Sequence, residues 1–302
     1  MPILLISLNE SRLVGLIFIC AIAGLTQAIY VGAFSWGHDD FNNWLRLTRH
    51  VGSSNSAITY GSMCATLFMI SLYFLLYKNN KSYILVFSSI IFLILFIITG
   101  TRGPAIGIII GFSYLLFAIR KDNKSNTSFK ISSLVLSIII ISIIATPNPL
   151  SERLKHLNQI NFSEPLKNNH VSLRERIYYI HYGLEELGDN ALIGIGPQNL
   201  RSNMQQSLDQ QKIISVYPVD HLHNDFLDII LKFGFFSIIL LFFIYYYLVK
   251  TKNLEHRVLL FLIMIMLTSS QITQSHFSHH QAITFFITLF YILQKKNSVP
   301  IK

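Results

Sequence analysis

Charged side chains are scarce in this sequence of 302 residues, where Asp, Glu, Lys and Arg together make up only 13%. Hydrophobic residues account for 52% and the mean hydropathy is +0.48, which is too apolar for a soluble domain with a solvated surface. Cysteine is nearly absent, and Cys20 and Cys64 both lie in apolar runs, which favours apolar packing over a disulfide. The composition therefore predicts a membrane protein.

Eight apolar runs are long enough to be interpreted as helices that cross about 30 Å of hydrocarbon. We expect an all-α polytopic membrane protein with one large, partly helical extracytoplasmic loop between the fifth and sixth spans. The predicted spans are 13–34, 58–77, 83–99, 105–119, 131–146, 235–249, 258–272 and 282–293. They divide the chain into N-terminal transmembrane helices, a loop domain and C-terminal transmembrane helices, at 1–146, 147–225 and 226–302.

The chain is basic, with 24 Lys and Arg against 15 Asp and Glu. The excess could indicate a nucleic-acid-binding surface or the basic cytoplasmic loops of a membrane protein, and the location of the charges decides between them. If the N-terminus is cytoplasmic, the cytoplasmic side receives thirteen basic and three acidic residues, whereas the other side receives eleven basic and twelve acidic residues. The excess is concentrated in short cytoplasmic loops, which is the positive-inside pattern and does not indicate a nucleic-acid-binding surface. This orientation places the polar clusters discussed below on the extracytoplasmic face.

The long loop carries helix signals of its own. Ser172 and Glu175 fit a capping box, and apolar residues then recur at helical spacing until Gly188, which predicts an amphipathic helix. A Gly/Pro turn at 191–200 and a weaker helix signal at 202–212 follow. The predicted apolar stripe consists of Ile177, Ile180, Leu184 and Leu187.

Three arginines are candidates for binding an anion. Arg102 lies in TGTRGP, where one span ends and Pro104 favours the start of the next helix, so free N–H groups and a permanent positive charge come together. An arginine that reaches to the membrane interface explains Arg102 equally well. Arg174 and Arg176 lie in the first turn of the amphipathic helix, where the dipole disfavours cations unless an anion is near. A solvated face is the favoured interpretation of that pair, and a phosphate bound by arginine forks is the alternative.

The stretch PVDHLHNDFLDIILKFG (218–234) brings His221 and His223 together with Asp220 and Asp225 at the edge of an apolar segment. H-x-H spacing alone is weak evidence for a metal, so a metal site is the less favoured interpretation. A neutral imidazole beside carboxylates is suited to removing a proton from a hydroxyl group. The sequence thus favours acid–base chemistry over metal binding.

Two more polar groups lie near this stretch or on the same face. Asp228 and Lys232, four residues apart on the following helix, are expected to pair where that helix leaves the bilayer. His276, His279 and His280 form a second histidine cluster. We interpret that cluster as an interfacial polar loop, or at most as lining of a site.

Three of these segments resemble the O-antigen ligase and polymerase superfamily of bacterial inner-membrane glycosyltransferases. The likeness is carried by TGTRGP (99–104), RERIYYIHYGLEELGDNALIGIGPQNL (174–200) and HLHNDFLDIILKFG (221–234), in the same order and with a large loop between the first and last. The ligases have an H-N pair separated from a glycine by nine residues, and His223, Asn224 and Gly234 match it here.

The resemblance implies a ligase that transfers a glycan from undecaprenyl diphosphate to a sugar hydroxyl of the lipid A core, with inversion, at the periplasmic face of the bacterial inner membrane. It implies a lipid-linked glycan donor, a lipid A core acceptor and membrane lipid as partners, with no nucleic acid, metal or other cofactor. The implied site residues are Arg102, Arg176 and, as an alternative, Arg174 for the diphosphate, His223 as general base, and His221, Asp220 and Asn224 as supporting neighbours.

The nearest alternative is the polymerase of the same superfamily, which joins lipid-linked repeat units to one another, and the three motifs do not separate it from the ligase. A protein O-oligosaccharyltransferase and a metal-dependent membrane hydrolase are less favoured. A transporter is also less favoured, because the predicted spans contain almost no ionisable residues at mid-depth.

Overall fold

The computed structural model describes residues 10–34, 57–101, 103–122, 171–210, 221–251, 253–274 and 280–295. Within these ranges the chain is helical and contains no strand, as predicted. The elements are α1 (Glu10–Phe34), α3 (Ala57–Leu72), the π-helix η2 (Tyr73–Tyr77), α4 (Tyr83–Thr99), α5 (Gly103–Lys121), α8 (Val171–Asn190), α9 (Pro197–Gln210), α10 (Asp225–Phe233), α11 (Phe235–Val249), α12 (Leu254–Thr273) and α13 (His280–Lys295).

Seven of the eight predicted spans lie on helices of the structure, and the remaining one, 131–146, lies outside the described residues. Among the described residues, four helical segments are long and apolar enough to cross a membrane: Ser11–Tyr30, Ala57–Tyr77, Gly103–Lys121 and Leu254–Thr273. Shorter apolar helices cover Tyr83–Thr99, Phe235–Val249 and His280–Leu293. The number of eight spans, the loop topology and the predicted domain boundaries stay predictions.

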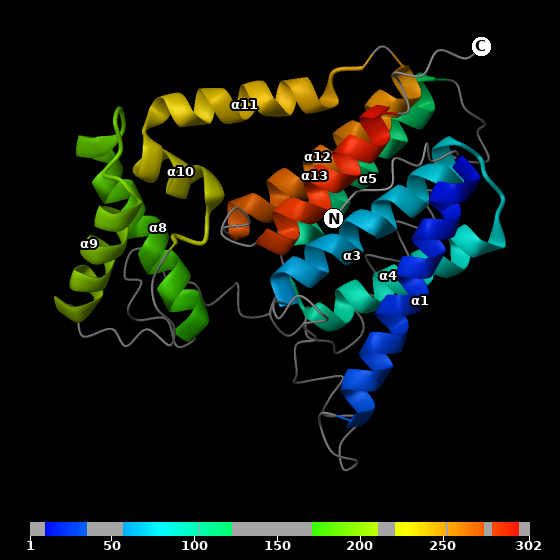
Figure 1. The fold of residues 1–302 in the computed structure, drawn as a ribbon, viewed down its shortest axis with the longest axis horizontal. Coiled ribbons are helices and arrows are strands. Elements are labelled where there is room, and N and C mark those ends of the chain that lie inside the picture. Colours follow the sequence, from blue (N-terminus) through cyan, green and yellow to red (C-terminus); the bar gives the residue numbers. More distant parts are fainter. Residues whose placement is uncertain are drawn as a thin grey trace. The chain divides into compact units, whose positions relative to one another are not determined.

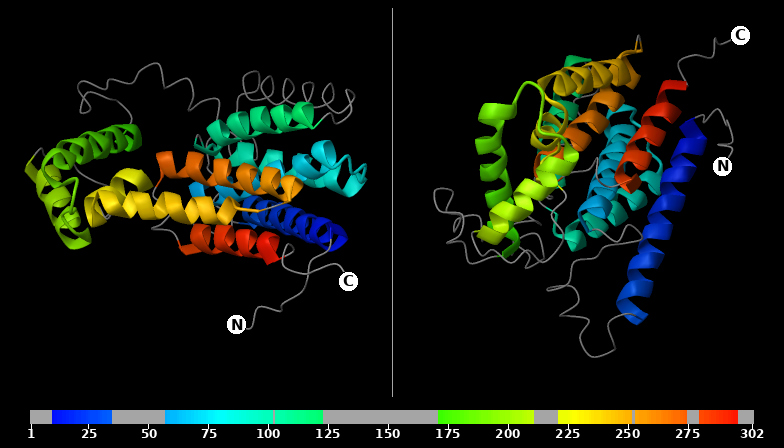
Figure 2. Two further views of the ribbon diagram at one scale, coloured as in Figure 1. Left: turned by 90° about the horizontal axis from the view of Figure 1, so that it is seen from above. Right: turned by 60° about the vertical axis from the view of Figure 1, so that its left-hand side comes forward.

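The chain forms two compact units, of which the first contains residues 1–155, 248–269 and 281–302. In this unit α3 packs against α4 and α5, and α4 also packs against α1 (Figure 1); Figure 2 shows the same helices from two further directions. A Cβ added to Gly61 of α3 would lie 2.2 Å from Oγ1 of Thr101 and 2.6 Å from Oγ1 of Thr99. The glycine thus lets α3 approach the buried threonines that precede Arg102 in the sequence.

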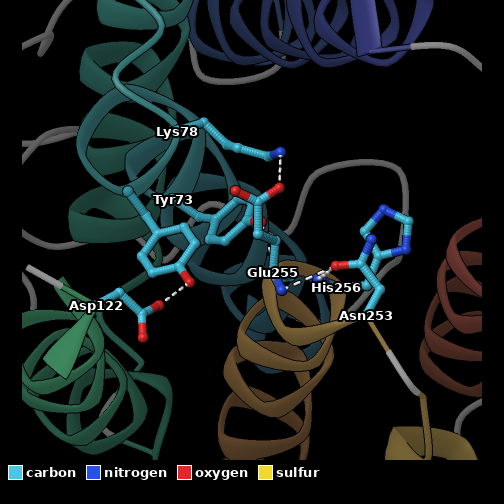
Figure 3. Close-up of polar contacts among 7 residues, drawn as sticks. Tyr73, Lys78, Asp122, Asn253, Glu255 and His256 are labelled. Carbon is cyan, nitrogen blue, oxygen red and sulfur yellow. Dashed lines mark hydrogen bonds and ion pairs between the residues drawn. The ribbon is translucent and has the colours of Figure 1, made fainter. Parts of the chain in front are cut away.

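A polar cluster in the first unit joins η2 to the start of α12 (Figure 3). The Tyr73 hydroxyl donates to the backbone carbonyl of Glu255 at 2.9 Å, and Lys78 forms an ion pair with the Glu255 carboxylate. The Asn253 side chain accepts the N–H of Glu255 at 3.0 Å, which satisfies a free donor at the first turn of α12. These bonds fix the start of α12, the helix whose other end contributes to the second unit.

The second unit contains residues 156–247 and 270–280, and α10 packs against both α8 and α9 (Figure 1). The predicted amphipathic helix is confirmed as α8, but its predicted buried face is wrong for two residues: Ile180 is 37% exposed and Leu184 is 59% exposed. Tyr178, Tyr179 and Tyr182 bury their rings instead, and the Tyr178 hydroxyl is hydrogen-bonded to Ser207 of α9 at 2.6 Å. The core consists of Tyr178, Tyr179, Tyr182, Leu200, Met204, Leu208, Leu222, Leu227 and Leu231.

The turn 191–196, which follows α8, is bonded through its backbone to the C-terminal end of α10. The Ile195 N–H donates to the Leu231 carbonyl oxygen at 2.7 Å, and the Phe235 N–H donates to the Ala191 carbonyl oxygen at 2.8 Å. We call these two bonds the turn contact. Because they join backbone to backbone, they set the position of α10 against α8 independently of side-chain packing.

Two glycines with positive φ make the turn contact possible. Gly194 has a φ of +79° and Gly234 a φ of +80°, a region in which a Cβ is unfavourable. A Cβ on Gly234 would lie 2.2 Å from the Leu192 carbonyl oxygen, and one on Gly194 would lie 2.7 Å from the Gly234 nitrogen. Gly234 is the glycine of the matched ligase pattern, and its conformation and close backbone contact both require the absence of a side chain.

Gly234→Ala is therefore expected to lower the melting temperature in detergent. It adds a backbone clash to the cost, about 1–3 kcal/mol, of holding a side-chain-bearing residue at φ +80° and ψ 173°, a conformation that is essentially restricted to glycine. Gly196→Ala is the matched control: its φ is +84° but a Cβ there would meet nothing within 4 Å, so only the conformational penalty applies. Gly188→Ala, in open space on α8, should be neutral or slightly stabilising, since Ala favours helix by up to about 1 kcal/mol. Equal losses for Gly234→Ala and Gly196→Ala would contradict the clash.

Candidate functional site

His223 lies immediately before α10 in a constrained backbone conformation. Its φ is +56°, in the left-handed region that favours glycine, and its N–H points at Nδ1 of His221, 3.4 Å away. Asn224 then caps α10, because its Oδ1 accepts the N–H of Leu227 at 3.0 Å. A non-glycine residue in this region costs about 1–3 kcal/mol and is found where the surroundings determine it, often at functional sites.

The imidazole of His223 has a defined neighbour on each side. Nδ1 lies 2.9 Å from Oε1 of Gln274, the ring stacks on Tyr179 with centroids 5.7 Å apart, and the ring of His221 meets it edge-on at 4.4 Å. An amide oxygen can only accept, so this contact requires the proton to be on Nδ1. His223 is half-buried, which leaves it accessible.

Asn224 adds a second connection to the end of α12. Its Nδ2 donates to the Ile272 carbonyl oxygen at 3.1 Å, two residues before the Gln274 that contacts His223. The carbonyl groups in the last turn of a helix have no partner within the helix, so Asn224 satisfies one of them. Asn224 thus caps α10 with its Oδ1 and donates to a carbonyl group in the last turn of α12 with its Nδ2. An asparagine beside the histidine can make both bonds because its side chain has both an acceptor and a donor.

Asp228 and Lys232 form the predicted pair on α10, with Nζ 2.5 Å from Oδ2. The other carboxylate oxygen of Asp228 accepts the buried N–H of Leu222 at 3.1 Å. Burial raises the pKa of Asp228, while Lys232, the Leu222 N–H and His221 act in the opposite direction. Asp228 therefore fixes the backbone of the 221–224 loop through its bond to the Leu222 N–H, and it is also an acidic neighbour of His221.

The remaining predicted residues differ in how far the structure describes them. Arg176 lies half-buried on α8, three residues before Tyr179 and so on the same side of the helix as the ring that stacks on His223. Arg174 lies in the first turn of α8. Outside the described residues lie Arg102, Asp220, His276 and His279.

Two residues of the site were not singled out by the sequence. Gln274 is buried just beyond the last residue of α12, and an amide directly after a predicted span, beside a histidine-rich segment, is the sequence signal that could have found it. Tyr179 looks like a core residue, and only the stacking with His223 distinguishes it. His280, the one described member of the second histidine cluster, is exposed at the start of α13. Among the described residues there is no group of three or more His, Cys, Asp or Glu side chains placed to hold a metal.

The sequence model of the family described as O-antigen ligase matches residues 87–242, just over half of the chain. The chain belongs to the O-antigen ligase family. The match includes TGTRGP, the α8 segment and the loop with His223, whereas Gln274 lies beyond it. No curated protein matches the chain.

Family membership and several apolar helices identify a multi-pass membrane protein. The family indicates a membrane glycosyltransferase-like ligase or polymerase whose substrate is a lipid-linked polysaccharide. In this ligase family member the histidine and asparagine of the matched pattern lie at the N-terminal end of α10 and the glycine lies at its C-terminal end. The nine residues between them are the length of α10 itself, which explains the fixed spacing.

Asp228→Ala is expected to destabilise this ligase family member more than Asp228→Asn does, because the asparagine oxygen can still accept the Leu222 N–H. An unpaired buried N–H costs about 1–3 kcal/mol, and that is the expected difference between the two variants in thermal or denaturant unfolding in detergent. Asp209→Ala on α9 is the control, since Asp209 also has an (i, i+4) partner, Gln205, but is exposed. If all three variants melted alike, Asp228 would not hold the loop.

Proposed function

We propose that this protein is an O-antigen ligase that transfers a glycan from undecaprenyl diphosphate to a sugar hydroxyl of the lipid A core. The observation that carries the proposal is the placement of the His223 ring. It lies half-buried just before α10 and stacks on Tyr179 of α8, which follows Arg176 by three residues. Nε2 of His223 removes the proton of the acceptor hydroxyl as its oxygen attacks the anomeric carbon. The bond from that carbon to the diphosphate breaks, which inverts the anomeric centre and releases undecaprenyl diphosphate.

The departing diphosphate gains negative charge, which fixed guanidinium groups stabilise in the transition state. We assign this role to Arg102 and Arg176, with Arg174 as the alternative to Arg176. The position of Arg176 one turn before Tyr179 supports it as the second arginine. His221, Asp220 and Asn224 support the base, and for Asn224 the cap of α10 and the bond to Ile272 are its means of doing so.

We further propose that eight spans cross the bacterial inner membrane with the site on the periplasmic side. The surplus of basic residues in the short loops between predicted spans supports this orientation. The proposed parts are transmembrane helices at 1–146, a periplasmic loop domain at 147–225 and transmembrane helices at 226–302.

His223→Ala should lower glycan transfer to the lipid A core by about 10²–10⁴-fold, because it removes the general base. Arg102→Ala and Arg176→Ala should each lower it by about 10²–10³-fold, because each removes a donor to the leaving diphosphate. The measurement is the transfer rate of the purified protein, with membrane amounts checked by immunoblot. Full activity of His223→Ala would contradict the assignment of His223 as the general base.

Matched controls are His181→Ala and Arg201→Ala. His181 is an exposed histidine that pairs with Glu185 on α8, and Arg201 is an exposed arginine on α9, so both changes remove the same chemical groups elsewhere. Both variants should transfer glycan at the wild-type rate. A metal chelator should also leave the wild-type rate unchanged, since the proposed mechanism uses no metal.

A deletion strain separates the ligase from the polymerase of the same superfamily. Loss of the ligase should abolish glycan-capped lipopolysaccharide while long glycan still accumulates on the lipid carrier. Gel separation of lipopolysaccharide and mass spectrometry of the carrier-linked glycans measure both. Accumulation of single repeat units on the carrier would instead assign the protein as the polymerase.

A further inference from the structure

Gln274 is the partner of His223 that the proposed function leaves unexplained. Its side chain is buried, with 4% exposed, and it follows the last residue of α12. Oε1 lies 2.9 Å from Nδ1 of His223. The residue lies outside the segment that the ligase family matches, so its role comes from the geometry alone.

Stacking on Tyr179 does not by itself determine which edge of the imidazole faces the substrate. The two rings are 21° from parallel. A rotation of the imidazole by 180° about its Cβ–Cγ bond would keep the same ring plane and exchange the positions of Nδ1 and the carbon Cδ2. This rotation would put a ring carbon, which is a poor donor, where Nδ1 now meets Gln274. The bond to Gln274 therefore selects one of two orientations that the stack permits.

The segment that carries Gln274 is held close to the histidine by a separate bond. Asn224, next to His223, donates to the Ile272 carbonyl oxygen at 3.1 Å. Two bonds thus join 223–224 to 272–274, so Gln274 is held by the backbone rather than only by the histidine that it orients. Supporting contacts of this kind keep a catalytic group within the narrow range of productive geometry.

A neutral amide has a different electrostatic effect from a carboxylate. A carboxylate at Nδ1 would orient the ring but would also stabilise its protonated form and raise the pKa of the histidine. The titratable and charged groups around His223 in the described part of the chain include Tyr179 at its face and His221 at its edge. They also include Arg176 on α8, the buried Asp225 at the start of α10, and Asp228 with Lys232 beyond His221.

We propose that Gln274 is a positioning residue that holds His223 as the tautomer with its proton on Nδ1, so that Nε2 faces the acceptor hydroxyl. This proposal rests on the proposed function for the identity of the reaction. The contact with Gln274 orients the ring without adding negative charge to it.

The test uses the full-length protein in detergent with Gln274→Leu, which keeps the volume but accepts no hydrogen bond, and Gln274→Glu, which accepts one and adds charge. Gln206→Glu, on the exposed surface of α9, controls for the added charge. Nitrogen NMR of histidine-labelled protein reads the tautomer, with the His223 signals identified by their loss in His223→Ala. Transfer is assayed from pH 5 to 9 with carrier-linked glycan and lipopolysaccharide core as substrates.

In the wild type, His223 should have its proton on Nδ1. Gln274→Leu should move the proton largely to Nε2 and lower kcat by about 10–100-fold, with KM changed less than about threefold. Gln274→Glu should keep the Nδ1 proton and shift the acidic limb of the pH–rate profile upward by about one pH unit, since a nearby carboxylate favours imidazolium. Gln206→Glu should leave the profile unchanged.

The outcomes separate this proposal from the assignment of the base. If His223→Ala is inactive but Gln274→Leu keeps the wild-type tautomer and pH profile, the role of Gln274 is wrong and the base stands. A wild-type signal with the proton of His223 on Nε2 would also contradict the proposed role of Gln274. If His223→Ala remains active, the proposed function fails whatever the tautomer is. If Gln274→Leu does not fold, an unshifted profile for Gln274→Glu still refutes the proposal.

Discussion

The turn contact is the interaction on which the candidate site depends. Two backbone hydrogen bonds join the turn after α8 to the end of α10, at 2.7 and 2.8 Å, and Gly234 permits the approach. α8 carries Tyr179 and Arg176, while the loop before α10 carries His223. Fixing one end of a nine-residue helix against its neighbour fixes the other end as well, since a short helix is rigid. A glycine eleven residues from the histidine can thus control the position of the histidine.

The end of α12 uses neutral polar groups where charged ones would be costly. Gln271 is fully buried, and its Oε1 accepts the Tyr245 hydroxyl at 2.6 Å, while its Nε2 meets no partner among the described residues, which costs far less than an unpaired charge would. Gln274 contacts His223. A buried amide with a partner loses little free energy, whereas an ion in the same place requires a counterion or a proton. Asp228 illustrates the second case: it is buried on α10, and it pairs with Lys232 and accepts the Leu222 N–H. The buried polar side chains at the end of α12, Gln271 and Gln274, are thus uncharged, in keeping with the low content of charged residues in the sequence.

The sequence predicts the helices well and the contacts between them poorly. Runs such as 83–99 and 235–249 coincide with α4 and α11, because a continuous apolar segment bounded by polar residues has only one satisfactory structure in lipid. His223, Asn224 and Gly234 are predicted through the spacing of a known pattern. The exposure of Ile180 and Leu184 is not predicted, because periodicity does not reveal which side meets α10. Gln274 is missed for a related reason: it meets His223 across 51 residues, and no local pattern records such a contact.

The choice of an amide rather than a carboxylate behind His223 follows from the charge of the proposed donor. A diphosphate leaving group brings negative charge toward the base, and this charge already favours protonation of the imidazole. A carboxylate on Nδ1 would add to that effect and would also repel the donor, so less of the histidine would be neutral when the substrates meet. Hydrolases with a carboxylate behind the histidine handle neutral amides or esters and avoid this conflict. In the proposed mechanism, the uncharged Gln274 orients the histidine, and the compensation of the leaving group's charge is assigned to the proposed arginines.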